Sequence, residues 1–293
     1  MKFNKIACLG LAAIVALGAL GCGSDNKAAD KKAGAKVTGQ ITGSGSSALL
    51  PLAKDAAAKF KAINPEVSIT LNGGGSGTGL KQVADGSVMI GNSDVAAETK
   101  LKPEVAKQLV DHKVCVVTMA PVINKDIAGK VKSLTKAQLK DIFTAKVTNW
   151  KEVGGPDEPI VLITRPATSG TRALFQEFAL GGAKEASNKF LETDDSGTLL
   201  QSVKDNKGAI GYVALSYLVN NKDVATVAID GVEPTLENTY NGKYPVWGYE
   251  HMYTKGEAKD AVKAFLDFIM SAEYGKSMES QGYGVTSKMQ VKR

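Results

Sequence analysis

The stretch over residues 163–172 (ITRPATSGTR) combines side chains that could hold a small anion without reacting with it. An apolar run over residues 160–163 predicts a buried strand, and Arg165 follows at its end. Ser169, Gly170 and Thr171 then begin an amphipathic segment that predicts a helix. A helix start offers free backbone N–H groups and the positive end of a dipole, which suits an anion such as phosphate. The alternative is an ordinary strand, turn and helix with a surface arginine.

A second stretch of the same design covers residues 43–48 (GSGSSA) and lies between a short predicted strand and a helical stripe of apolar residues. Ser46, Ser47 and Ala48 close this loop. Because Pro51 fits only the first turn of a helix, we expect the helix to begin near Ser46 or Ser47. The loop therefore predicts another set of hydroxyl and backbone donors at a helix start.

Two further polar loops precede helical patterns. Residues 73–79 (GGGSGTG) contain Ser76 and Gly77 but lack the Gly-Lys-Ser/Thr of a nucleotide P-loop. Residues 194–198 (DDSGT) contain Ser196, and Asp195 is placed to cap the helix that follows. One glycine-rich loop is more often only a turn, but the recurrence of this design favours an anion site.

Asp94 ends a short apolar strand over residues 88–94 (VMIGNSD). Its simplest role is that of a helix cap or turn residue. The alternative is an acceptor that faces a ligand.

The composition excludes several classes of protein. The chain has 293 residues, 23% of them charged and 43% hydrophobic, which is long enough for two lobes. Its net charge is +6, and removal of Lys2 and Lys5 with the leader leaves about +4, with the basic residues scattered and few aromatic ones, so nothing indicates nucleic-acid binding. His112 and His251 are the only two histidines, and Cys115 lacks a partner at metal-ligand spacing, so we expect neither a metal nor a cofactor.

The N-terminus has the form of an export signal. Lysines in residues 1–5 precede an uncharged apolar run over residues 6–20 that is too short for a comfortable membrane span. Residues 19–22 (ALGC) resemble a bacterial lipobox, in which Cys22 would be lipidated and become the mature N-terminus. We expect a signal peptide over residues 1–21 and a flexible tether over residues 22–36. The alternative is a plain secretory signal, and either way the protein is exported.

Strand and helix patterns alternate along the rest of the chain, which predicts an α/β fold with mostly parallel sheets. Strands are expected at residues 37–42, 67–71, 88–94, 114–122, 160–163 and 209–213. Helices are expected after residue 46, after residue 79, and at residues 103–110, 135–143, 169–178 and 258–269.

Taken in order, residues 43–48, 75–79, 90–94 and 165–171 resemble the phosphate-binding component of the bacterial high-affinity phosphate ABC transporter. The resemblance implies a two-lobe periplasmic-binding-protein-like fold of type II, each lobe a mixed, mostly parallel sheet flanked by helices, with the ligand in the cleft between them. It also implies the phosphate ligands Ser47, Ala48, Ser76, Asp94, Arg165, Ser169, Gly170 and Thr171. Ser46, Gly77 and Ser196 are expected to line the cleft.

From the positions of these motifs we expect lobe one to contain residues 37–120 and 231–293, and lobe two residues 121–230. The chain would cross between the lobes near residues 119–122 and 227–230. The resemblance further implies a monomer that binds inorganic phosphate and delivers it to permease subunits of an ABC transporter. Lipid on Cys22 would anchor it to the bilayer, facing the periplasm or the extracellular side.

Asp94 gains a function in this interpretation. A carboxylate repels an oxyanion unless a cation such as Arg165 offsets its charge. The anion must also carry an O–H group that can donate a hydrogen bond to the carboxylate. Phosphate carries such a group near neutral pH and sulfate does not. An unmatched buried polar group costs about 1–3 kcal/mol, so we expect roughly tenfold or greater preference for phosphate.

Three alternatives remain open from the sequence. The protein could bind another tetrahedral oxyanion, such as sulfate, molybdate or tungstate. It could be an exported surface sensor or adhesin of the same fold. It could also be a phosphatase or hydrolase with Ser47 or Ser169 as nucleophile, although neither serine lies in a Gly-x-Ser-x-Gly elbow.

Overall fold

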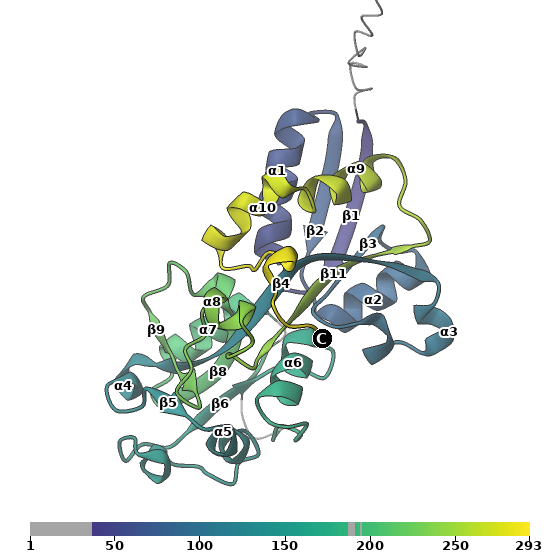
Figure 1. Cartoon of the computed structure of the whole chain (residues 1–293). Helices are drawn as coiled ribbons and strands as arrows, with labels where there is room; N and C mark the ends of the chain where they lie inside the picture. The colour runs from purple at the N-terminus through teal and green to yellow at the C-terminus, as the bar shows by residue number, and fades with distance from the viewer. Residues whose placement is uncertain (1–36, 187–190, 194) are drawn as a thin grey trace, which may run out of the picture. The chain divides into compact units, whose positions relative to one another are not determined.

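A mixed β-sheet organises the part of the chain that the computed structural model describes, which is residues 37–186, 191–193 and 195–293. Within these residues nine strands form one sheet in the order β2-β1-β3-β11-β4-β8-β6-β7, with β9 paired to β4, and β5 and β10 pair separately (Figure 1). The strands are β1 (Gly39–Gly45), β2 (Val67–Asn72), β3 (Ile90–Ser93), β4 (Leu109–Asn124), β5 (Ser133–Leu134), β6 (Val161–Thr164), β7 (Leu191–Glu192), β8 (Ala209–Ala214), β9 (Val224–Thr226), β10 (Ala228–Ile229) and β11 (Trp247–Lys255).

Helices connect most of these strands and cover the sheet. The α-helices are α1 (Leu50–Ile63), α2 (Ser76–Asp85), α3 (Pro103–Ala106), α4 (Lys125–Ala128), α5 (Lys136–Phe143), α6 (Gly170–Phe178), α7 (Ser196–Asp205), α8 (Leu236–Tyr240), α9 (Asp260–Ile269) and α10 (Ala272–Met278). Short 3₁₀ turns are η1 (Ala97–Thr99), η2 (Trp150–Val153), η3 (Leu215–Tyr217), η4 (Glu279–Gln281) and η5 (Thr286–Lys288). The expected α/β class is confirmed.

Parallel strands lie at both ends of the sheet, and antiparallel strands join them. β1 pairs in parallel with β2 and β3, and β6 pairs in parallel with β7 and β8. The long strands β4 and β11 run antiparallel to each other in the middle. β4 pairs with β11 over its first part and with β8 from Met119 to Ile123. A single strand therefore passes from one parallel group to the other.

Separate hydrophobic clusters lie under the two groups of parallel strands. In the first, α1 packs Phe60 edge-on to Phe265 of α9, with ring centroids 5.6 Å apart. In the second, Phe175 of α6 stacks on Tyr212 of β8 at 4.2 Å, and Phe143 of α5 meets both rings. In Figure 1, α1 and α9 lie beside β1 and β2, whereas α5 lies at the opposite end near β6. Each parallel group thus has its own apolar support.

Two sequence-based boundaries are wrong. The helix expected from Ser46 or Ser47 begins at Leu50. β1 stays in the sheet through Gly45, which pairs with Asn92 of β3, and a turn in which the Ser46 hydroxyl accepts from the Leu49 N–H separates the strand from the helix. The helix expected over residues 103–110 ends at Ala106, because Leu109 already pairs with Lys255 in the β4–β11 ladder. In both places strand pairing overrides the local helical pattern.

Some local predictions hold in detail. The Thr135 hydroxyl accepts a hydrogen bond from the Gln138 N–H at 3.1 Å, and the Gln138 side chain accepts one from the Thr135 N–H at 2.9 Å. This capping box starts α5. Cys115 is fully buried and Trp150 packs in the second cluster, as expected.

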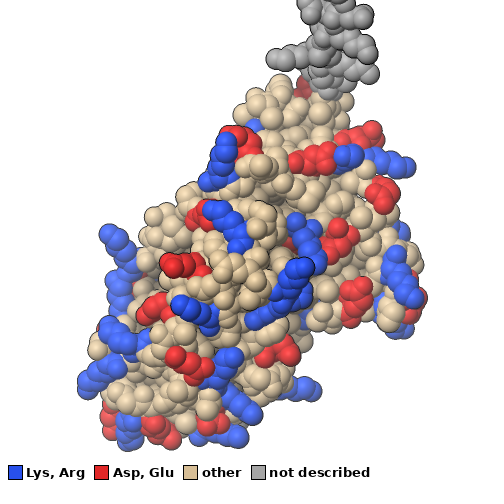
Figure 2. Space-filling view, in the orientation of Figure 1, with Lys and Arg blue, Asp and Glu red and all other residues tan. Residues whose placement is uncertain are grey.

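Surface charge and membrane-spanning potential agree with the composition. Lys and Arg are interspersed with Asp and Glu on the visible face (Figure 2). Among the described residues, no helix combines the length and hydrophobicity needed to cross a bilayer. The predicted signal peptide (residues 1–21), the tether (residues 22–36) and Cys22 lie outside those residues.

We expect Gly79→Ala to destabilise the junction of α2, β1 and β3. A Cβ at Gly79 would lie 2.5 Å from the Ser44 carbonyl oxygen and 2.6 Å from the Gly45 Cα, both of which are backbone atoms held in a sheet. Overpacking of this kind costs about 1–3 kcal/mol, to be measured as the free energy of unfolding in denaturant. Gly129→Ala is the control, because a Cβ there would meet no atom of the described residues within 4 Å. Equal denaturation midpoints for the two variants would contradict the expectation.

Candidate functional site

The predicted site residues lie at strand ends and helix starts. Residues 46–48 follow β1, Asp94 follows β3 and Arg165 follows β6 directly. Ser76, Gly170 and Ser196 are the first residues of α2, α6 and α7. The carboxyl ends of parallel strands meet at one edge of a sheet, which is where open α/β folds hold ligands. The topology therefore gathers residues that are far apart in the sequence.

Arg165 is the centre of the first group. It is completely buried, and its Nη2 donates to Ser47 Oγ at 2.9 Å and to Ser196 Oγ at 3.0 Å. The two serine hydroxyls lie 2.9 Å apart. Both serine hydroxyls are neutral groups that accept hydrogen bonds from the guanidinium. The group therefore brings a guanidinium and two hydroxyl groups together in a place that is shielded from water.

Asp94 is the centre of the second group and is also buried. Thr171 Oγ1 donates to its Oδ2 at 2.7 Å, and the Asp94 N–H donates to Ser76 Oγ at 3.0 Å. Because Ser76 Oγ accepts that bond, the Ser76 hydroxyl hydrogen remains available for another acceptor. The predicted acceptor thus lies beside two predicted donors, one from α2 and one from α6.

The start of α6 is built as the sequence predicts. Ser169 is its N-cap, and its hydroxyl accepts from the Arg172 N–H at 3.2 Å. The N–H groups of Gly170 and Thr171 belong to the first turn, which has no acceptors within its own helix. A Cβ on Gly170 would lie 2.2 Å from Ser76 Oγ, so only glycine lets α6 approach α2 this closely.

Two tyrosines that sequence analysis did not select hold the loop after β1. Tyr217 donates from its hydroxyl to the Ser47 carbonyl at 2.7 Å, and Tyr283 donates to the Ala48 carbonyl at 2.6 Å. Ser46 turns its hydroxyl toward the Leu49 N–H at 2.9 Å. Both tyrosines come from distant parts of the chain, and a lone tyrosine at a strand or turn carries no recognisable motif.

Gly77 and Ser196, both expected to line the cleft, make different kinds of contact. The Gly77 N–H donates to the Thr168 carbonyl at 2.9 Å, so it joins the loop before α6 to α2. Ser196, in contrast, contacts Arg165 directly. Asp195 caps α7 by accepting from the Thr198 N–H at 2.8 Å, as its sequence position predicted.

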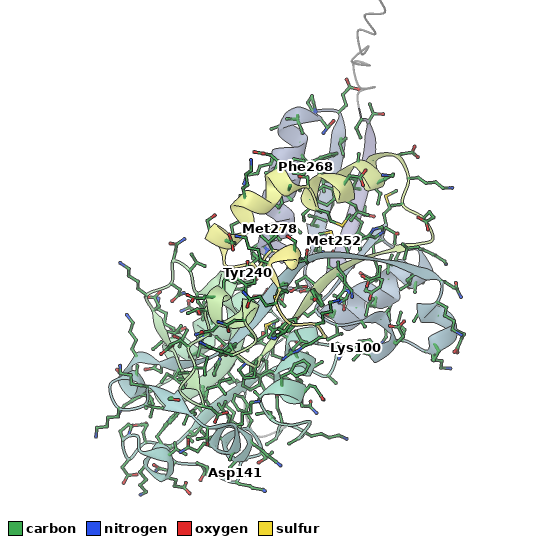
Figure 3. The ribbon with its side chains drawn as sticks, viewed as in Figure 1. Lys100, Asp141, Tyr240, Met252, Phe268 and Met278 are labelled. Atoms are coloured by element: carbon green, nitrogen blue, oxygen red, sulfur yellow. The ribbon has the colours of Figure 1, made fainter. Side chains whose placement is uncertain are left out.

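Lys100 is a further residue that sequence analysis missed. Its Nζ donates to the Ala167 carbonyl at 2.8 Å and to the Ser169 carbonyl at 3.3 Å, beside the start of α6 (Figure 3). Burial lowers the pKa of Lys100, and the charge of Asp94 acts in the opposite direction. Lys100 therefore adds positive potential near Asp94 and holds the loop that precedes α6.

Arg172 holds the backbone at Arg165. It donates from Nη1 to the Arg165 carbonyl, and its Nε lies 3.4 Å from Glu185 Oε2. Burial raises the pKa of Glu185 to about 7, against the opposing charge of Arg172. This chain of contacts fixes the end of β6, from which Arg165 projects.

The described residues offer no arrangement for metal or nucleophilic catalysis that we can identify. Among them, no group of three or more His, Cys, Asp or Glu side chains could hold a metal ion. His251 bonds Asp111 at 2.8 Å, and His112 bonds Thr254 at 3.1 Å. A serine nucleophile needs an adjacent base, and these histidines are engaged with other residues.

Comparison with known proteins now defines the class. The model of the family described as PBP superfamily domain matches residues 30–273. A Clostridium perfringens protein, described as an ABC transporter substrate-binding protein with bound phosphate, has a similar crystal structure with a TM-score of 0.77 and 35% identity, covering 87% of this chain and all of that one. An ABC-type phosphate transport receptor from Vibrio cholerae gives a TM-score of 0.66 at 27% identity, covering 83% of this chain and 99% of that one. The fold is the type II fold of solute-binding proteins.

A curated relative narrows the family. The phosphate-binding protein PstS of Bacillus subtilis is 47% identical over 301 residues, covering the whole of this chain and 98% of that protein. PstS of Staphylococcus epidermidis is 29% identical, covering 99% of this chain and 91% of that protein. The chain belongs to the PstS family within the PBP superfamily.

We expect Tyr217→Phe to weaken the loop that carries Ser47. The change removes the 2.7 Å bond and leaves the Ser47 carbonyl without that donor, which costs about 1–3 kcal/mol of unfolding free energy. Tyr249→Phe is the matched control, because that ring takes part in contacts with Trp247 and Lys113 outside the site. Denaturant unfolding of the two variants measures the difference, and equal stabilities would argue against this role for Tyr217.

Proposed function

We propose that this protein binds inorganic phosphate outside the cytoplasm and delivers it to the permease of an ABC transporter. The observation that carries the proposal is the buried pair of groups around Arg165 and Asp94, with hydroxyls from Ser47, Ser76 and Thr171. A tetrahedral anion needs several donors at different angles and a countercharge, and these groups supply both. Membership of the PstS family supports phosphate as that anion.

We propose that Ser47, Ala48, Ser76 and Asp94 approach the anion from one side, and that Arg165, Ser169, Gly170 and Thr171 approach it from the other. Contacts already join the two sides: Arg165 donates to Ser47 at 2.9 Å and Thr171 donates to Asp94 at 2.7 Å. A ligand that adds contacts to both sides favours their association, which is the basis of closure in two-lobe binding proteins.

The lobes are part of the same proposal. We propose lobe one as residues 37–120 and 231–293 and lobe two as residues 121–230, with the first crossing inside β4. The support for that crossing is the change of partner along β4, from β11 up to Thr118 to β8 from Met119 onward. The return near residue 230 stays a prediction.

The N-terminal residues and the folded body together suggest how the protein is located and assembled. We propose that Cys22 is lipidated, that residues 22–36 act as a tether, and that the protein is a membrane-anchored monomer facing the periplasm or the extracellular side. The body without the tether, residues 37–293, lies within one compact unit and is suitable for solution experiments. We also propose that the protein has no enzymatic activity, and expect no turnover of p-nitrophenyl phosphate.

Calorimetric titration of residues 37–293 tests the ligand. We expect phosphate and arsenate to bind, because both carry an O–H group near neutral pH that can donate a hydrogen bond to Asp94. Sulfate lacks that group, so we expect its affinity to be at least about tenfold lower. Tight binding of sulfate or molybdate with weak phosphate binding would instead assign the protein to the other oxyanion class.

Asp94→Asn tests selectivity. The amide removes the negative charge and can offer N–H donors to an unprotonated oxyanion, so we expect the preference for phosphate over sulfate to fall about tenfold or more. Asp195→Asn is the control, because asparagine also caps helices and the Asp195 side chain accepts from the Thr198 N–H of its own helix. An unchanged ratio of the two affinities in Asp94→Asn would remove Asp94 from this role.

A further inference from the structure

Glu250 is a fully buried acidic residue that neither the sequence motifs nor the proposed ligand set includes. It lies on β11 opposite Cys115 of β4, where the register of the β4–β11 ladder shifts between Glu250 and His251. On its other side β11 pairs with β3, where His251 lies opposite Ser93, so Glu250 comes beside Asp94, the residue that follows Ser93. Glu250 therefore lies next to Asp94, the acceptor of the candidate site.

The hydrogen bonds of these two carboxyls do not balance if both are ionised. Asp94 Oδ2 accepts from Thr171 at 2.7 Å. Oδ1 of Asp94 and both carboxyl oxygens of Glu250 are buried without a well-aligned donor among the described residues. Two ionised carboxylates that lie beside each other in a buried place repel strongly, because little water screens them. A proton held between the two groups removes the repulsion and supplies the missing donor.

The surroundings decide which carboxyl holds the proton. Burial raises the pKa of Glu250 well above its ordinary value, and the charge of Asp94 raises it further. Asp94 already accepts the Thr171 hydroxyl at Oδ2 and has the Lys100 ammonium nearby, so its Oδ1 is the atom that a proton on Glu250 would meet.

The other titratable neighbours do not compete for this proton. Cys115 and Tyr283 also face Glu250, and burial raises the pKa of both groups, so both stay neutral. Tyr217, which is influenced by Asp94, has its pKa raised to about 12 by burial. His251, on the same strand, bonds Asp111 instead.

We propose that Glu250 is a neutral carboxylic acid that donates a hydrogen bond to Oδ1 of Asp94, and that it is a positioning residue for anion recognition. The bond fixes the Asp94 carboxylate so that Oδ2 lies toward Thr171 and the ligand. It also limits the pair to one negative charge beside an anion that itself carries one or two. The positioning role rests on the proposed phosphate binding, whereas the protonation of Glu250 does not.

Glu250→Gln and Glu250→Met separate the donor from the shape. Glutamine keeps the size and an N–H donor but cannot ionise, so we expect phosphate affinity within about threefold of wild type at neutral pH. Methionine keeps the length but removes the donor, so we expect affinity at least about tenfold lower, because hydrogen bonds to charged groups contribute about 1.5–3 kcal/mol. Equal affinities of Glu250→Met and wild type would overturn the positioning role.

Infrared difference spectroscopy of the ligand-free protein tests the proton directly. The spectrum of wild type minus Glu250→Gln at neutral pH is expected to contain the carbonyl stretch of a protonated acid. The matched control is Glu257→Gln, which changes an exposed glutamate just after the same strand and should remove only carboxylate bands. Loss of carboxylate bands alone in Glu250→Gln would overturn the proposal, even if Glu250→Met failed to fold.

Unfolding as a function of pH gives a second reading of the same proton. The folded protein keeps a proton that the unfolded chain releases, so wild-type stability falls relative to Glu250→Gln as pH rises above the ordinary glutamate pKa. Parallel stability curves would contradict a neutral Glu250. If the infrared test finds the acid but wild type does not bind phosphate, the proposed function fails and the positioning role fails with it. If phosphate binds and Glu250 is ionised, only the proposal for Glu250 fails.

Discussion

Arg165 and Asp94 are charged side chains in buried positions, and each of them needs hydrogen-bond partners there. The rest of the site follows from this requirement. A buried charge is costly unless hydrogen bonds surround it. Here the nearby donors and acceptors are largely hydroxyls: Ser47 and Ser196 around the guanidinium, and Thr171 on the carboxylate. Hydroxyls can turn to donate or accept, so the same side chains can serve each other and an anion. That property suits reversible binding.

The sheet makes this pairing possible because it brings two sets of strand ends together. The parallel groups around β1 and β6 each present loops and helix starts, and the antiparallel pair β4 and β11 connects them. β4 belongs to both groups, so a small bend in this strand would move one set of donors relative to the other. β11 has a second function in our proposal. Glu250 lies where the register of β11 shifts, and we propose that it donates a hydrogen bond to Asp94.

Much of the site could be predicted from local sequence, and the reasons are physical. The cap of α6 by Ser169, the cap of α7 by Asp195 and the capping box of α5 depend on residues within one turn of each other. The predictions failed where a distant strand decided the outcome, as at the start of α1 and the end of α3. Hydrogen bonds between strands form with residues far along the chain, which no local pattern contains.

By itself, the sequence determined the α/β class, the helix starts that carry Ser76 and Ser169, and the strand ends that carry Asp94 and Arg165, because each depends on short-range periodicity and capping. Only the tertiary structure decided which of these residues meet. It joined Arg165 to Ser196 as well as Ser47, and it added Lys100, Tyr217 and Glu250, none of which lies in a motif. Their roles arise from burial and from neighbours more than a hundred residues away or on another element, and these are properties of the folded chain alone.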